Sequence, residues 1–247
     1  MLYVAEGMGT NTTAMLVGMH ERGIRPDAIA FADTGGERPH TYQYISILNN
    51  WLFEKEFPLV EVLHQSRETL EENCLRRHAL PSIAYGFKTC SQRFKGDPQS
   101  KYLRNHPMAK EEWALGRKVV KAIGFDFDEP QRAKHYEDDR TVNWYPLVEW
   151  EWGRDECVEA IQRAGLPQPG KSSCFFCPNM RPSEIREMAQ QYPSLADRAI
   201  EMERNAELTQ VKGLGRSHSW EGLLKNGELF DFPDRFDSMP CDCYDGD

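Results

Sequence analysis

The sequence contains no run of the roughly 20 consecutive apolar residues that a membrane-spanning helix requires. Its first five residues lack the basic stretch and the small-residue cleavage site of a secretory leader. We therefore expect a cytoplasmic protein with no membrane partner. No internal repeat or low-complexity tract stands out, and 40% hydrophobic with 28% charged residues is typical of a folded globular chain of 247 residues.

Positive charge is scarce, because 30 Lys and Arg residues face 39 Asp and Glu residues, a net charge of −9. Non-specific binding of DNA or RNA comes mainly from neutralising phosphates with basic side chains, so this balance excludes wholesale electrostatic binding of nucleic acid. A local basic pocket is still compatible with it. None of the 7 histidines has the spacing of a metal-ligand set or a catalytic triad, and we assign none of them a catalytic role.

Short apolar runs alternate with helical patterns over the first 165 residues. Strands are expected at residues 2–5, 28–32, 59–63, 119–125 and 145–148, and helices at 12–19, 42–52 and 154–164. This alternation predicts an α/β fold with a doubly wound, mainly parallel sheet. After a Pro- and Gly-containing linker, polar helical patterns follow at 183–191 and 194–208. We expect a nucleotide-binding domain over residues 1–165 and a C-terminal helical, cysteine-bearing extension over 166–247.

A glycine-bearing turn separates the first strand from the first helix. Backbone N–H groups in such a turn wrap around phosphate, and the helix N-terminus adds partial positive charge. The turn has no lysine, which excludes a Walker A loop. A second turn follows the next strand, so both turns are expected at the carboxyl edge of the sheet, where open α/β proteins bind ligands. The residues of the two turns are Gly7, Met8, Gly9, Thr10, Asn11, Thr12 and Thr13, and Asp33, Thr34 and Gly35.

The two turns belong to longer blocks, residues 7–14 and 31–41, and further blocks follow at 90–98, 124–132, 145–150 and 173–178. In this order the blocks resemble the PAPS reductase family of the PP-loop ATP pyrophosphatase superfamily. That family includes sulfonucleotide reductases and the ATP-hydrolysing protein of DNA phosphorothioation. The family loop usually reads Ser-Gly-Gly-x-Asp-Ser, so Gly7 stands here in place of a serine and Asn11 in place of a carboxylate.

The resemblance implies an adenine nucleotide alpha hydrolase-like fold that binds ATP with Mg²⁺ at the two turns, with Arg93 as a further phosphate contact. Thr12 and Arg132 are the expected catalytic residues. The implied reaction activates an oxygen of a second substrate by nucleotidyl transfer and releases pyrophosphate, in sulfur transfer or nucleic-acid modification. The partners would be an adenine nucleotide and a nucleic acid or a sulfur-donor protein. Asp33 and Asp126 are open to two interpretations, Mg²⁺ ligands or helix caps.

Seven cysteines in a cytoplasmic chain indicate metal binding or redox chemistry rather than a disulfide framework. Cys174 and Cys177 have the spacing of two ligands of one metal ion. Cys90 lies in a segment similar to the first cluster-ligating block of the family. The resemblance implies that these three cysteines bind a [4Fe–4S] cluster, with Cys241 or Cys243 as the fourth ligand. Thiolates suit Zn²⁺ as well, and spacing does not separate the two.

Two alternative functions stay open. In a sulfonucleotide reductase, no ATP is cleaved and a C-terminal cysteine thiolate attacks the sulfate sulfur. The other alternative is a non-catalytic nucleotide-binding partner subunit, because Gly7 and Asn11 depart from the family loop.

Overall fold

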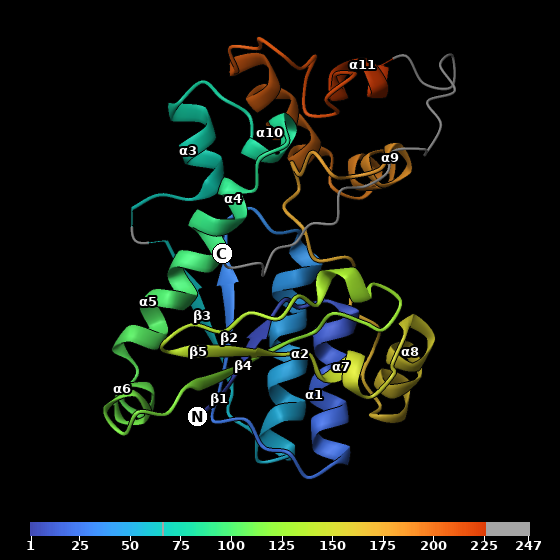
Figure 1. The fold of residues 1–247 in the computed structure, drawn as a ribbon. Coiled ribbons are helices and arrows are strands. Elements are labelled where there is room, and N and C mark those ends of the chain that lie inside the picture. The colour runs from blue at the N-terminus through green and yellow to red at the C-terminus, as the bar shows by residue number, and fades with distance from the viewer. Residues whose placement is uncertain (66, 226–247) are drawn as a thin grey trace. The chain divides into compact units, whose positions relative to one another are not determined.

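The computed structural model describes residues 1–65 and 67–225 (Figure 1). They contain one sheet of five strands in the order β3-β2-β1-β4-β5. The strands are β1 (Leu2–Glu6), β2 (Ala28–Asp33), β3 (Val60–His64), β4 (Val119–Ile123) and β5 (Thr141–Trp144). The pairs β1–β2, β1–β4 and β4–β5 are parallel. The predicted α/β fold with a doubly wound parallel sheet is confirmed.

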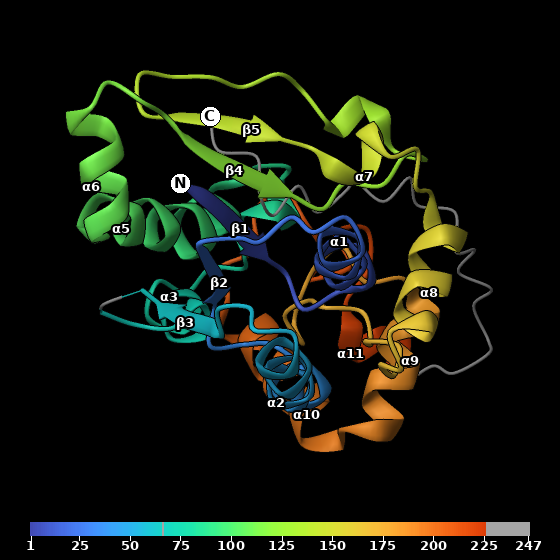
Figure 2. The ribbon, with the colours of Figure 1, turned by 90° about the horizontal axis from the view of Figure 1, so that it is seen from below.

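The chain forms two compact units. The first comprises residues 1–33, 38–63 and 97–172, and the second residues 34–37, 64–96 and the described residues from 173 onward. The helices of the first unit are α1 (Thr10–Glu21), α2 (Pro39–Glu54), α5 (Asp97–Asn105), α6 (Pro107–Ala114), α7 (Pro146–Glu149) and α8 (Arg154–Arg163). Figure 2 shows α1 and α2 on one face of the sheet and α5 and α6 on the other. The predicted division after residue 165 stays a prediction.

The two central strands are buried almost throughout. Every residue of β2 is buried, and so is β1 except for Leu2 at its start. Parallel strands covered on both faces read as continuous apolar runs rather than alternating ones, which is why these segments could be identified from the sequence. Val4 of β1, Ile29 of β2 and Leu16 of α1 belong to the core of this unit. Each such side chain contributes about 1.5–3 kcal/mol when it is fully buried.

The predicted strand at residues 145–148 is wrong. The last strand of the sheet is β5, which ends at Trp144, and the short helix α7 begins at Pro146. The proline ring holds φ near the helical value and removes an N–H, so Pro146 suits the first turn of a helix and cannot donate to a strand ladder. The Trp150 N–H closes the helical turn on the Pro146 carbonyl at 2.8 Å.

The second unit is helical. It contains α3 (Leu70–Arg76), a 3₁₀ turn (Ser82–Tyr85), α4 (Thr89–Ser91), a π-helical turn (Gln92–Gly96), α9 (Pro182–Gln191), α10 (Pro193–Asn205) and α11 (Trp220–Lys225). The last three include the helices predicted at 183–191 and 194–208. Phe176 and Trp220 are fully buried in its core. Among the described residues, no helix combines the length and the apolar character that a membrane span requires.

We expect Gly124→Ala to destabilise the first unit. A Cβ atom at Gly124 would lie 2.8 Å from Cγ2 and 2.9 Å from Cα of Thr12, at the start of α1. Overpacking against backbone atoms costs about 1–3 kcal/mol, so the urea midpoint should fall. Gly96→Ala is the matched control, because a Cβ atom there meets nothing within 4 Å. An unchanged midpoint for Gly124→Ala would contradict this close contact.

Candidate functional site

The glycine turn joins the end of β1 to the start of α1 (Figure 1). Gly9 is the N-cap residue of α1 and provides no side-chain cap. Met8 has a positive φ of 56° although its side chain is buried. A non-glycine residue in this left-handed conformation costs on the order of 1–2 kcal/mol, and such strain persists only where neighbouring groups hold it.

Glu6, the last residue of β1, stabilises the glycine turn by accepting hydrogen bonds from it. Its side chain is fully buried, and Oε1 accepts hydrogen bonds from the Met8 N–H at 2.7 Å and the Thr12 hydroxyl at 2.5 Å. The Thr12 hydroxyl in turn accepts the Gly7 N–H at 3.2 Å. Burial is the largest influence on Glu6 and raises its pKa to about 7, against the lowering effect of these hydrogen bonds.

The structure therefore brings Gly7, Met8, Gly9 and Thr12 together in one turn, and the Thr12 hydroxyl, predicted to be catalytic, donates to a carboxylate of the protein itself. The predicted roles of these residues stay predictions. The sequence analysis missed Glu6. The signal that could have found it is a carboxylate that ends an otherwise apolar strand directly before the glycine turn.

Acidic residues follow the strands on both sides of β1. Asp33 ends β2 and accepts a hydrogen bond from the Tyr42 hydroxyl at 2.9 Å. Asp126 follows β4 and accepts one from the Asn11 amide at 2.8 Å. Its other oxygen, Oδ1, is buried without a hydrogen-bond partner among the described residues, and burial is the main cause that raises the pKa of Asp126. A buried carboxylate oxygen without a hydrogen-bond donor is suited to bind a cation.

Arg154, at the first position of α8, was missed by the sequence analysis. Its guanidinium donates to the Asn11 side-chain oxygen at 3.2 Å. Asn11 therefore lies between a cation and the carboxylate of Asp126. This places a guanidinium beside the first turn of α1, where it can contact phosphate oxygens.

Arg132 has structural partners. Its guanidinium pairs with Glu129 at 2.6 Å and lies 4.3 Å from the centre of the Phe125 ring, which stacks on Tyr145. A contact with a nucleotide would have to compete with this ion pair. The catalytic role of Arg132 stays a prediction.

In the second unit, residues 34–37 pair with the segment that carries Cys174. The Phe175 N–H donates to the Gly36 carbonyl at 2.8 Å, and Glu37 and Cys174 form an antiparallel bridge. The Thr34 hydroxyl lies 3.1 Å from the Cys174 sulfur. The second predicted nucleotide turn is thus divided: Asp33 belongs to the first unit, whereas Thr34 and Gly35 belong to the second, beside a cysteine.

One pocket of the second unit brings together three of the predicted metal ligands, Cys90, Cys174 and Cys177, beside apolar walls such as Ile83 and Phe176. Soft sulfur donors in an apolar pocket fit a thiolate-bound metal or cluster. Burial raises the pKa of Cys174 well above its usual value, so that metal binding there must displace a proton. Within residues 1–65 and 67–225, no three His, Cys, Asp or Glu side chains form a ready-made metal site. Cys241 and Cys243 lie outside the described residues.

A buried ion pair adjoins this pocket. The Lys95 ammonium lies 3.3 Å from the Glu37 carboxylate, and both side chains are buried. Lys95 also lines the pocket with the three cysteines. A buried charge is tolerated when it is compensated in this way. The sequence analysis did not find this pair, because its members are far apart in the chain.

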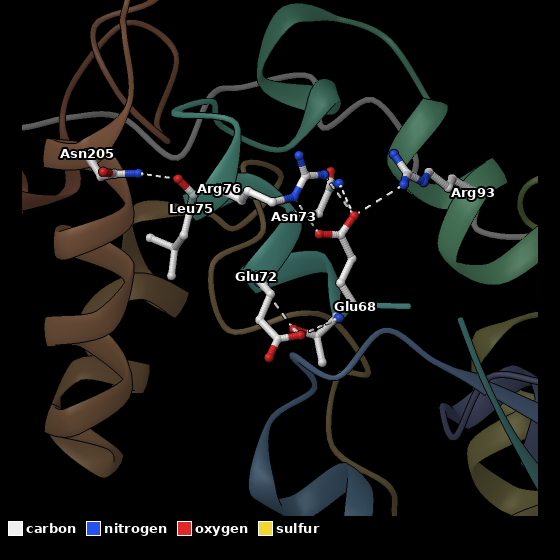
Figure 3. Close-up of polar contacts among 8 residues, drawn as sticks. Glu68, Glu72, Asn73, Leu75, Arg76, Arg93 and Asn205 are labelled. Carbon is white, nitrogen blue, oxygen red and sulfur yellow. Dashed lines mark hydrogen bonds and ion pairs between the residues drawn. The ribbon is translucent and has the colours of Figure 1, made fainter. Parts of the chain in front are cut away.

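Arg93, predicted as a nucleotide contact, belongs to a polar network of the second unit (Figure 3). Its guanidinium lies 3.3 Å from Glu68, which Arg76 also contacts at 3.0 Å. The hydrogen bond from Arg76 is the largest of the effects that lower the pKa of Glu68 to about 2. The predicted role of Arg93 in nucleotide binding stays a prediction.

No known protein-family model and no curated protein matches the chain. Among the solved structures that are similar to it are the following two. One is a phosphoadenylyl-sulfate (PAPS) reductase from Candida auris in complex with phosphate, with a TM-score of 0.45 and 16% identity over 68% of this chain and 74% of that one. The other is the U34-tRNA thiolase NcsA from Methanococcus maripaludis with its [4Fe–4S] cluster, with a TM-score of 0.44 and 14% identity over 93% of this chain and 81% of that one. Both TM-scores are below 0.5.

We expect Glu6→Gln to gain stability relative to the wild type as the pH rises. A carboxyl group whose folded pKa is raised from 4.5 to about 7 stabilises the folded state below pH 4.5, and this contribution is lost as the pH rises through 7. The ionisation of Glu6 should lower the free energy of unfolding of the wild type by about 3 kcal/mol in total. Glutamine does not titrate, so Glu6→Gln should not show this loss. Urea unfolding of both proteins between pH 5 and pH 8 measures it. A stability difference that does not change with pH would show that Glu6 does not titrate in this range.

Proposed function

We propose that the protein binds ATP with Mg²⁺ at the glycine turn of the first unit and transfers a nucleotidyl group to an oxygen of a second substrate. The observation that supports this proposal is the strained turn before α1, in which Gly9 leaves the helix without a side-chain cap. The first-turn N–H groups of such a helix are donors for phosphate oxygens, and the helix dipole favours negative charge there.

The residues around the turn suit this chemistry. In nucleotidyl transfer the acceptor oxygen forms a bond to the α-phosphorus, and the bond from that phosphorus to the bridging oxygen breaks as pyrophosphate leaves. The helix N-terminus and the Arg154 guanidinium would bind the charge that develops on the leaving group. Asp126 and Asp33 would hold Mg²⁺, which neutralises charge on the phosphate oxygens when bound. Because the protein mainly positions reactants in such a reaction, no protein nucleophile is required.

The cysteine pocket forms the second part of the proposal. We infer that Cys90, Cys174 and Cys177 bind a [4Fe–4S] cluster together with Cys241 or Cys243, and Zn²⁺ is the alternative. The three thiols that line one apolar pocket support this inference. A thiolate-bound cluster in a chain that also activates a nucleotide is consistent with sulfur transfer or nucleic-acid modification, with a nucleic acid or a sulfur-donor protein as partner.

Arg154→Ala should weaken binding of a non-hydrolysable ATP analogue with Mg²⁺ by about tenfold or more, because a hydrogen bond to a charged group contributes about 1.5–3 kcal/mol. Arg163→Ala is the matched control, because Arg163 lies at the other end of the same helix and pairs with Glu21. Isothermal titration calorimetry of metal-replete protein gives both dissociation constants.

The same titrations with adenylyl sulfate (APS) and phosphoadenylyl sulfate (PAPS) distinguish ATP-dependent transfer from the two alternative functions, a sulfonucleotide reductase and a non-catalytic partner subunit. Sulfonucleotide binding with sulfite release, and no ATP binding, would indicate a sulfonucleotide reductase. ATP binding without turnover in the presence of candidate acceptors would favour the partner subunit. If no adenine nucleotide binds to metal-replete protein, the proposal is wrong.

Iron, sulfide and zinc analysis of anaerobically purified protein tests the cysteine pocket. We expect about four irons and four sulfides per chain with a broad visible absorption band. Cys90→Ser and Cys177→Ser should each lose most of the iron, whereas Cys157→Ala should retain it, because Cys157 is buried in the other unit. One zinc without iron would exclude the cluster and leave the nucleotide site untouched.

A further inference from the structure

Some hydrogen-bond donors of the glycine turn bind groups of the protein itself, and those of the first turn of α1 are suited to the proposed ligand. The Met8 N–H and the Thr12 hydroxyl donate to Glu6, and the Gly7 N–H donates to Thr12. The first half of the turn therefore already binds a carboxyl group of the protein itself. The first turn of α1, capped by Gly9 alone, is the part that is suited to an external phosphate.

We propose that Glu6 is a positioning residue whose protonation is coupled to phosphate binding: the turn binds a polyphosphate tightly when Glu6 is neutral and weakly when Glu6 is ionised. This inference rests on the proposed function, because it requires a phosphate-bearing ligand at this turn. Glu6 acts through Met8, whose left-handed backbone it holds, and through Thr12, whose hydroxyl it orients.

The two oxygens of Glu6 are not equivalent. Oε1 accepts both hydrogen bonds, whereas Oε2 is buried without a hydrogen-bond partner among the described residues. A buried carboxylate oxygen without a donor is costly, and a proton on Oε2 removes the charge. The neutral carboxyl group keeps Oε1 as the acceptor of the Met8 N–H, so protonation preserves the shape of the turn. The proton comes from solvent when the ligand binds.

Electrostatic repulsion provides the coupling. A phosphate bound at the first turn of α1 would be repelled by an ionised Glu6, because no basic side chain in the described part of the chain pairs with Glu6. At the effective dielectric constant of protein sites, two like unit charges about 10 Å apart weaken binding by on the order of tenfold. Binding therefore favours proton uptake, and by linkage low pH favours binding.

The titratable groups around Glu6 do not account for the expected pH dependence of binding in its place. Opposite it on β2 is Phe31. Tyr44 of α2 faces it, and the pKa of Tyr44 is raised, mainly by burial and also by the Glu6 charge. Asp33 is bonded to Tyr42, and Asp126, whose pKa is also raised, is bonded to Asn11. The pKa of Glu6 is raised to about 7, which places its titration in the physiological range.

Dissociation constants of a non-hydrolysable ATP analogue with Mg²⁺ between pH 6 and pH 8.5 test this coupling. The wild type and Glu6→Gln should bind equally at pH 6, and the wild type should bind about tenfold or more weakly than Glu6→Gln at pH 8.5. Protonation of the ligand and of Asp126 affects both proteins alike, so the ratio of the two constants isolates Glu6. Glu21→Gln, at the other end of α1, is the matched control and should behave as the wild type.

Calorimetry at pH 7.5 in two buffers of different protonation enthalpy measures proton uptake directly. For each ligand bound, the proton uptake of the wild type should exceed that of Glu6→Gln by a fraction of a proton. If Glu6→Gln does not fold, the wild-type uptake is the test that remains: it should be greatest just above pH 7, and its absence there overturns the coupling. A wild-type to variant ratio that is constant with pH also overturns it, and leaves ATP binding intact. Failure of both proteins to bind the analogue contradicts the proposed function instead.

Discussion

Parallel pairing of β1 with β2 and β4 brings three strand ends to one edge of the sheet, and every candidate group of the first unit depends on that arrangement. Glu6, Asp33 and Asp126 each lie at or just after one of these ends. Antiparallel pairing would send alternate ends to opposite edges and separate the three carboxylates. The glycine turn and the N-terminus of α1 lie at the same edge, so phosphate-binding donors and carboxylates meet there.

The edge is electrostatically unusual, because two of its carboxylates have raised pKa values and the third is bonded to a tyrosine hydroxyl. A site made only of carboxylates would repel phosphate. The helix N-terminus, the Arg154 guanidinium and a bound Mg²⁺ would offset that repulsion. The buried position of Glu6 makes the balance depend on a single proton, and the strained backbone of Met8 shows that the turn is held by its neighbours rather than by its own preference.

The second unit has a different organisation. Residues 34–37 pair with the segment around Cys174, and this pairing places a cysteine, a threonine and a buried ion pair at one pocket. The apolar walls exclude water and raise the pKa of Cys174. Such surroundings disfavour a free thiolate as nucleophile and suit a thiolate that is bound to a metal. For Cys174, burial therefore argues against a reactive thiolate.

The sequence by itself determined the fold class, the glycine turn, the helices α1, α2, α8, α9 and α10, and the Cys174–Cys177 spacing, because hydrophobic periodicity and short-range spacing are local properties of the chain. It did not reveal that residues 146–149 form a helix, that Arg132 is paired with Glu129, or that Thr34 lies beside Cys174. It also gave no indication of the Lys95–Glu37 pair or of the raised pKa of Glu6. Several site contacts join distant segments: Thr34 and Cys174 are 140 residues apart, and Asn11 and Asp126 are 115 apart. Only the tertiary structure decides such contacts, because burial and pairing are set by which segments meet.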